Sequence, residues 1–414
     1  MPLKIRNELS EIEYSLTEVV PNINHEQTYF ELSDVQNSIK IYIDYVLTIY
    51  RDDKIDYKHE DYSLFILKSF ELNKENDIFQ VYEKVADLRI GWIFPIQALV
   101  SNKHGCAENE HFLKYAYVAF YKLLLNQEDY SHFTPSIEQI EDYKLTDFYG
   151  DNIIILILFK TNIEKIDNFN IDNYLASLYS HSYYYCEPTE NIKKINNCQP
   201  TEDLNEIKNR ADLKSSGNTR LILQRSSKCL QAEPYIDRIF KSLLKTEEHH
   251  LVRFYLLYQV IELMIQRVFE RKISDEINNF NNNPDKNIRK LKEKIDNIST
   301  EKKRVSILIN DDVKINNLNL LTSCNELIKL FNDDDSNEKD DSNKKQDLGG
   351  ALYDVRCLIV HQFRKLPDKT LEEKLREINK EFENIVIKII LDYKEMSNSE
   401  GTGNGQQGTG KTHV

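Results

Sequence analysis

Arg356 and His361 are the two side chains whose types and spacing could carry out chemistry together. They stand five positions apart in ALYDVRCLIVHQFRK (351–365), a segment otherwise rich in Leu, Ile and Val. Arginine is permanently charged and forks onto phosphate oxygens, and histidine takes or gives a proton near neutral pH. The pair therefore fits phosphate binding coupled to proton transfer. The alternative is structural, with an arginine that bridges a neighbouring acid and a satisfied core histidine.

The spacing of the pair limits what one copy of the segment can do. The apolar segment has the character of a core helix, and five residues on an α-helix turn through about 500°. The Arg356 and His361 side chains then point about 140° apart. One helix alone would not aim both groups at one ligand atom.

The surroundings of the pair resemble the HEPN family, whose R-x4–6-H motif lies in an α-helical bundle. Tyr353, Arg356 and His361 occur in LYDVRCLIVH and are followed by a closing amphipathic helix. The segment RFYLLYQVIELMI (253–265), with Glu262 inside an apolar run, resembles the first core helix of HEPN domains. The resemblance covers roughly residues 240–396, and residues 1–200 have no counterpart in it.

The resemblance implies a site built from two protomers. HEPN domains dimerise with their motif helices facing each other, so that two arginines and two histidines line one cleft. Arg356 would then bind and stabilise the scissile phosphate of RNA, and His361 would act in proton transfer, with no metal ion and no cofactor. Glu262 is either an ion-pair partner of Arg356 or an acid on a solvated helix edge. Tyr353 and Cys357 complete the supporting residues.

Cys357 departs from the family pattern, in which active members usually carry Asn, Asp or His after the motif arginine. The expected function is a metal-independent endoribonuclease that cuts RNA, with tRNA a candidate substrate, at a site formed across a homodimer. The resemblance further implies a defence or toxin effector, controlled by a regulatory partner or a phage-derived trigger. Two alternatives stay open. One is an inactive HEPN-like module for dimerisation or for binding a nucleotide or RNA, and the other is a helical scaffold with a chance motif.

Basic residues near the motif are candidate RNA contacts. Segment 286–305 carries eight Lys and Arg against three acids. The alternative is a solvated helix face with charge pairs four residues apart, which is the commoner outcome for such runs. The candidates, two of which follow the motif directly, are Arg289, Lys290, Lys292, Lys303, Arg304, Arg364 and Lys365.

The length of 414 residues predicts two domains. Residues 1–200 form an N-terminal region, mixed α/β or mostly helical, that would sense or position something. Within it, FLKYAYVAFYKLLL (112–125) has helical spacing, whereas IKIYIDYVLTIY (39–50) and DNIIILILFK (151–160) fit strands and buried helices equally well. Residues 187–218, with their Pro, Asn, Gly and Ser, mark a linker.

Residues 219–396 are expected to form the HEPN-like helical bundle of a protein that is mainly α. A short strand is expected at 219–224, and helices at 246–273 and 370–396, where apolar residues recur three and four apart. Residues 332–347 contain no apolar side chain and predict a disordered insert. The last residues, 397–414, have the composition of a flexible tail.

Composition and motif spacing argue against several classes of protein and binding site. The net charge of −14 argues against non-specific coating of nucleic acid. No apolar signal region or membrane-span length is found, so a cytoplasmic protein without a membrane partner is expected. His104, Cys106 and His111 lack the four-ligand spacing of a zinc site. GQQGTGKT (405–412) matches a phosphate loop by letter, but it lacks the flanking strand and helix and is interpreted as tail.

Overall fold

The computed structural model describes most of both predicted regions. The described residues are 4–7, 13–15, 21–23, 28–33, 38–43, 58–70, 76–125, 136–137, 145–149, 153–185, 219–231, 233–246, 249–333, 346–362 and 368–394. The predicted linker at 187–218, most of the predicted insert at 332–347 and the predicted tail at 397–414 lie outside them.

A six-stranded sheet organises the N-terminal region. Its order is β11-β6-β10-β8-β7-β12, and neighbouring strands are antiparallel except for the parallel pair β7 and β12. The strands are β6 (Tyr62–Ser69), β7 (Phe79–Glu83), β8 (Leu88–Pro95), β10 (Ile153–Phe159), β11 (Tyr183–Tyr185) and β12 (Arg220–Leu223). Two three-stranded sheets, β2-β1-β9 and β3-β4-β5, are made of β1 (Lys4–Asn7), β2 (Glu13–Ser15), β3 (Pro21–Ile23), β4 (Thr28–Ser33), β5 (Ser38–Ile43) and β9 (Ser136–Ile137).

Strand β10 explains why residues 153–159 are apolar throughout. Successive side chains of a strand point to opposite faces, and both faces of this strand are buried. Ile155 packs in a core shared with α2 (Glu110–Leu125), while Ile154 packs in a second core on the other face. A strand that is covered on both sides needs no polar alternation. The structure thus shows residues 153–159 as a strand, and residues 39–43 of the other ambiguous segment belong to strand β5.

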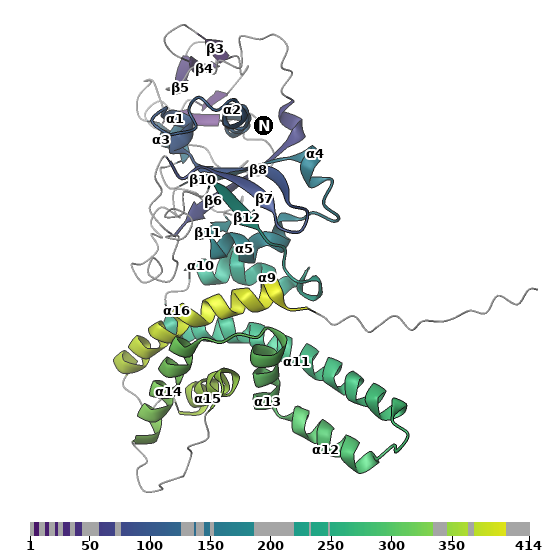
Figure 1. The fold of residues 1–414 in the computed structure, drawn as a ribbon. Coiled ribbons are helices and arrows are strands. Elements are labelled where there is room, and N and C mark those ends of the chain that lie inside the picture. Colours follow the sequence, from purple (N-terminus) through teal and green to yellow (C-terminus); the bar gives the residue numbers. More distant parts are fainter. Residues whose placement is uncertain are drawn as a thin grey trace, which may run out of the picture.

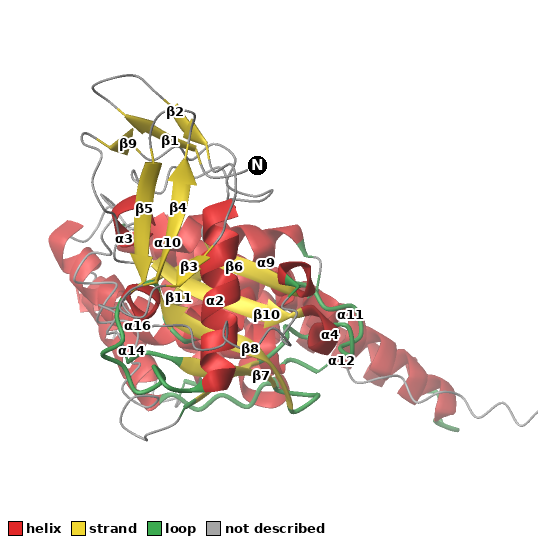
Figure 2. Cartoon of the chain, turned by 90° about the horizontal axis from the view of Figure 1, so that it is seen from above, coloured by secondary structure: helices red, strands yellow, loops and turns green. Residues whose placement is uncertain are grey.

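Helices cover both faces of this sheet. Figure 1 shows α2 on one face and α5 (Leu175–Ser180) on the other, and in Figure 2 α2 runs across the strands. Further short α-helices among the described residues of this region are α1 (Gln97–Val100), α3 (Leu145–Tyr149) and α4 (Lys160–Ile163).

The C-terminal region is helical around the long helices α11 (His250–Asn282) and α16 (Asp368–Asp392). These two pack along each other, and the rings of Phe254 and Phe382 lie 5.3 Å apart between centroids. The other helices are α9 (Pro234–Arg238), α10 (Leu244–Thr246), α12 (Ile288–Ser299), α13 (Glu301–Ser306), α14 (Leu318–Asp333) and α15 (Leu348–Gln362). The second half of α11 and α12 form a hairpin that extends from the body (Figures 1 and 2).

One buried ion pair joins the two regions. Arg253 of α11 and Glu383 of α16 each expose 1% of their side chains. Arg253 Nε donates to Glu383 Oε2 at 3.1 Å, and Nη2 donates to the same oxygen. Arg253 also donates to the Tyr179 hydroxyl of α5 and to the Leu244 carbonyl, both at 2.8 Å. The arginine therefore ties two bundle helices to the helix that covers the sheet.

The mainly α fold with a helical C-terminal region is confirmed, and the N-terminal region is the mixed α/β alternative. The predicted strand at 219–224 forms, but the domain range 219–396 needs a correction. β12 joins the N-terminal sheet, because pairing with β7 buries Leu221 and Leu223 in the core of that sheet. The bundle therefore begins after β12. Among the described residues, no helix combines the length and the apolar character that a membrane crossing requires.

Candidate functional site

Helix α15, which carries the motif, lies very close to α13. A Cβ on Gly349 would lie 2.6 Å from the Cα of Ser306, so that two helix backbones meet where only glycine fits. Lys302 of α13 also reaches both carboxylate oxygens of Asp354, at 2.8 and 2.6 Å. These contacts fix the position of α15 and of the motif side chains on it.

Arg356 lies half-buried between α15 and α11. Its Nη2 donates to Glu262 Oε1 at 3.1 Å, so Glu262 is an ion-pair partner. Its guanidinium also lies over the Tyr258 ring, 5.9 Å from the centroid. Burial opposes the charge, but the hydrogen bond to Glu262 and the nearby Glu301 carboxylate raise the pKa of Arg356 above its usual value. Arg356 stays charged, and with 24% of its side chain exposed it remains within reach of an anion.

His361 lies in the last turn of α15, and its side chain is exposed. It is therefore not a core histidine. Among the described residues, no hydrogen bond or ion pair engages it. Because α15 is helical through both motif positions, the predicted angle of about 140° between the Arg356 and His361 directions applies. The two groups of one protomer do not converge.

Tyr353 and Cys357 lie one helical turn apart on α15 and form a pair of their own. A hydrogen bond between their side chains, together with partial burial, raises the pKa of the Tyr353 phenol to about 12. The phenol therefore stays protonated at neutral pH. Cys357 is thus engaged with Tyr353, and it offers Arg356 no strong polar neighbour of the kind Asn, Asp or His would supply.

Three of the predicted basic contacts, Arg289, Lys290 and Lys292, lie on α12, in the hairpin that extends from the body (Figure 1). All three are exposed. Arg289 pairs with Glu293, four residues later, at 3.5 Å. This pair is what the solvated-face alternative predicts, so α12 does not gather its charges at the motif.

The remaining basic candidates divide into two groups. On α13, Lys303 is exposed, whereas the Arg304 guanidinium packs over the Phe269 ring at 5.0 Å from the centroid. Arg304 therefore stabilises the junction of α13 with α11. Arg364 and Lys365 lie outside the described residues.

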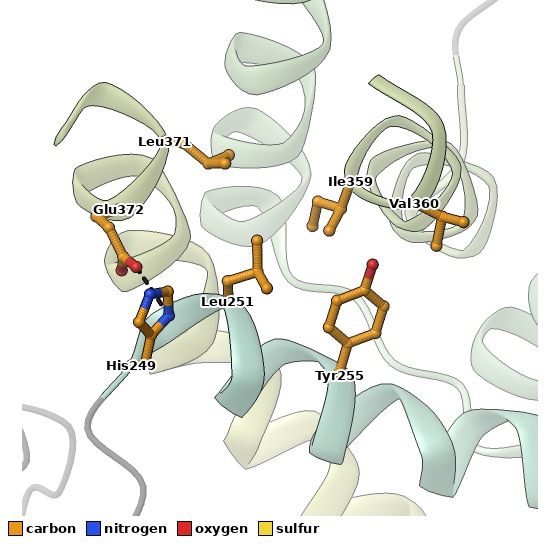
Figure 3. Close-up of a pocket in the computed structure, with 7 residues that line it drawn as sticks. All are labelled: His249, Leu251, Tyr255, Ile359, Val360, Leu371 and Glu372. Atoms are coloured by element: carbon orange, nitrogen blue, oxygen red, sulfur yellow. Dashed lines mark ion pairs between the residues drawn. The ribbon is translucent and has the colours of Figure 1, made fainter. Parts of the chain in front are cut away.

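A pocket opens beside the motif, between α11, α15 and α16, with a cavity volume of about 400 Å³. Figure 3 shows the ion pair of His249 and Glu372 on one side and Tyr255 beneath α15 on the other. His249 Nδ1 lies 2.9 Å from Glu372 Oε1. The remaining lining residues are aliphatic: Leu251, Ile359, Val360 and Leu371. The pocket thus has an apolar floor, an aromatic wall and a charged end.

Sequence reasoning missed this pocket, although one signal was present. Tyr255 and Glu262 stand seven residues apart on α11, so that a helix places them on the same face two turns apart. That face is the one that meets α15. His249 pairs with Glu372, 123 positions later along the chain, and such a pairing has no local signature in the sequence.

No group of His, Cys, Asp and Glu within the described residues has the arrangement of a metal site. His104 is buried, and its Nε2 lies 3.2 Å from the Ala98 carbonyl oxygen. That contact engages His104 within the N-terminal region. No protein-family model, curated protein or solved structure matches the chain.

Proposed function

We propose that this protein is a metal-independent endoribonuclease of the HEPN type, of the kind found in defence and toxin systems, with a site formed across a homodimer. The observation that carries the proposal is the placement of the motif. Arg356 is held half-buried by Glu262 yet stays accessible, and His361 is exposed at the end of the same helix. The same helix thus presents a cation for a phosphate and a proton-transfer group, on different sides.

The direction of the two side chains supports a dimeric site. Within one protomer they are about 140° apart and about 7.5 Å apart along the helix axis. Two facing copies of α15 would bring Arg356 of one protomer towards the partner's His361. Val360, next to His361 on α15, exposes 38% of its surface. Covering it would stabilise such a contact between copies.

The proposed reaction is transesterification within the RNA. His361 removes the proton from a 2′-OH, and the 2′-oxygen attacks the adjacent phosphorus. Arg356 stabilises the added negative charge of the phosphorane. The bond from phosphorus to the 5′-oxygen breaks, and the protonated His361 returns its proton to that oxygen through water. The products are a 2′,3′-cyclic phosphate and a 5′-hydroxyl, and the net proton count is unchanged.

A second candidate function is an inactive module that dimerises or binds RNA or a nucleotide. The observation in its favour is the acidity around Arg356, because Glu262 and Glu301 both act on its charge. Two carboxylates beside one guanidinium weaken its attraction for a phosphate. Cys357, paired with Tyr353, adds no compensating donor.

RNA cleavage in EDTA tests the proposal. Purified protein is incubated with total tRNA and with a generic single-stranded RNA, beside Arg356→Ala and His361→Ala. Matched controls are Arg238→Ala and His111→Ala, which remove exposed side chains far along the chain from the motif. We expect each motif variant to lose about 100-fold or more in cleavage rate and the controls to cleave like the wild type.

The dimeric site has its own test. Arg356→Ala and His361→Ala chains are co-expressed with different tags, and the mixed dimer is purified through both. One functional arginine and one functional histidine then meet in the shared cleft. We expect partial recovery of cleavage over either variant alone. A mixed dimer as inactive as its parents contradicts a shared site.

A further inference from the structure

We propose that the pocket between α11, α15 and α16 binds the guanine base of the nucleotide next to the scissile phosphate. The inference rests on the proposed function for its substrate class, RNA. It adds a base preference that the motif does not specify. The residues that would make the base contacts are Tyr255, His249 and Glu372.

The size and lining of the pocket fit one base. Its volume of about 400 Å³ lies near the lower end of the roughly 300–1,000 Å³ typical of small-molecule sites. Proteins that read single-stranded RNA stack unpaired bases on aromatic rings and bind their Watson–Crick edges. Tyr255 supplies the ring, and Leu251 and Ile359 supply apolar surface for the flat faces of the base (Figure 3).

The charged end of the pocket favours guanine among the four bases. The Watson–Crick edge of guanine presents two adjacent donors, N1–H and the exocyclic N2 amine, which a carboxylate can accept together. Glu372 has 31% of its side chain exposed, and its Oε1 lies 2.9 Å from His249 Nδ1. That contact orients the carboxylate, and no other described residue forms a hydrogen bond or ion pair with its second oxygen. Adenine and cytosine offer one exocyclic amine, and uracil offers a single ring N–H.

The charges along this surface determine the orientation of the bound nucleotide. Glu372 repels phosphate, and Arg356 attracts it, so the base lies at the acidic end and the phosphate at the motif end. The connection is short, because Val360 lines the pocket and lies one helical turn after Arg356 on the same face of α15. The Arg356 charge also acts on the Tyr255 phenol, whose pKa is raised by burial and lowered by that charge. The pocket and the motif are therefore contiguous.

Nucleotide binding to the 414-residue protein tests the inference without relying on cleavage. Dissociation constants for guanosine, inosine and adenosine 5′-monophosphates are measured by calorimetry or ligand-observed NMR. Inosine monophosphate lacks only the N2 amine of guanine. We expect it and adenosine monophosphate to bind about tenfold more weakly than guanosine monophosphate.

Three variants connect the affinity to the pocket. Glu372→Gln should weaken guanosine monophosphate binding about tenfold, and Tyr255→Ala should do so to a similar extent by removing the stacking surface. Glu373→Gln is the matched control, because this exposed carboxylate is the next residue on α16. It should bind like the wild type. Unchanged circular dichroism and melting temperature show that each variant folds.

The outcomes separate the pocket from the proposed function. No binding of guanosine monophosphate up to about 10 mM, equal affinity for the inosine analogue, or wild-type affinity in Glu372→Gln overturns the inference. Cleavage that shows no preference for guanine also overturns it and leaves the ribonuclease intact. Specific guanine binding by a protein that cuts no RNA supports the base-binding inference and contradicts the proposed ribonuclease function.

Discussion

The buried pair of Arg253 and Glu383 gives the strongest prediction about stability. Each side chain is 99% buried, since each exposes 1%. In Glu383→Gln the carboxylate is replaced by a neutral amide of the same shape, and the arginine charge is left in the interior with weaker partners. Removing one member of a buried pair costs about 3–5 kcal/mol, because the remaining charge lacks compensation.

The remaining hydrogen bonds of Arg253 place the Glu383→Gln variant at the lower end of this range. Arg253 keeps its hydrogen bonds to the Tyr179 hydroxyl and the Leu244 carbonyl, both at 2.8 Å, in the Gln variant. Those bonds satisfy part of the guanidinium, so we expect about 3 kcal/mol for Glu383→Gln and nearer 5 kcal/mol for Glu383→Ala, which also opens a cavity. Replacing both charges by apolar side chains, as in Arg253→Met with Glu383→Leu, should recover most of the loss.

Urea unfolding measures these free energies with two probes. The single tryptophan, Trp92, is buried in the N-terminal sheet, and circular dichroism follows the helices. With a slope of about 3 kcal/mol per molar urea, a loss of 3 kcal/mol lowers the midpoint by about 1 M. Because Arg253 also binds Tyr179 of α5, both probes should shift together. Glu373→Gln, an exposed carboxylate on the same helix, should leave both midpoints unchanged.

Two results would refute this reasoning. One is a Glu383→Gln midpoint within the error of the wild type, which would mean that the pair adds nothing to stability. The other is a double variant as unstable as the sum of the two single losses. That sum would mean that the residues act through packing alone and not through their mutual charge.

Three further predictions follow from the contacts around the motif. Gly349→Ala should lower the free energy of unfolding by about 1–3 kcal/mol through overpacking. At Gly350 an added Cβ would meet side-chain atoms no closer than 3.2 Å, so Gly350→Ala should be neutral or stabilising by up to about 1 kcal/mol. Thermal unfolding of the two variants measures this difference. Glu262→Gln should change the free energy of unfolding by less than about 1 kcal/mol, because the ion pair with Arg356 is partly exposed. It should nevertheless slow RNA cleavage about tenfold, because Arg356 is no longer held in place. A wild-type cleavage rate in this variant would contradict the prediction. Burial raises the pKa of Cys324 to about 12, so iodoacetamide at pH 8 should spare this thiol in the folded protein and label it in urea, as peptide mass spectrometry can show.

Much of the helical region could be predicted because its pattern is local. The long apolar stripes of α11 and α16 recur at helical spacing, and the predicted ranges 246–273 and 370–396 contain the central turns of both helices. Segment 151–160 could not be assigned, because an apolar run without alternation fits a two-sided buried strand and a buried helix alike. Its pairing with β6 and β8 makes it a strand, and those partner strands lie far from it along the chain.

The candidate site was predictable in its residue types and less so in its partners. The ion pair of Arg356 with Glu262 was among the expected contacts, and the structure contains it. Arg253 was overlooked although it shares the buried stripe of α11 with Leu257, four residues later. A charge on an apolar stripe signals a buried partner. The identity of that partner, Glu383, depends on how α11 and α16 cross, and no sequence spacing reveals that.

The most direct test of the central claim is RNA cleavage in EDTA, followed by analysis of the new ends. The account predicts that the wild type cuts RNA to leave a 2′,3′-cyclic phosphate and a 5′-hydroxyl. It also predicts that Arg356→Ala and His361→Ala, folded by circular dichroism, lose about 100-fold or more of that rate. Equal cleavage by the wild type and both variants, or ends of the opposite polarity, would contradict it.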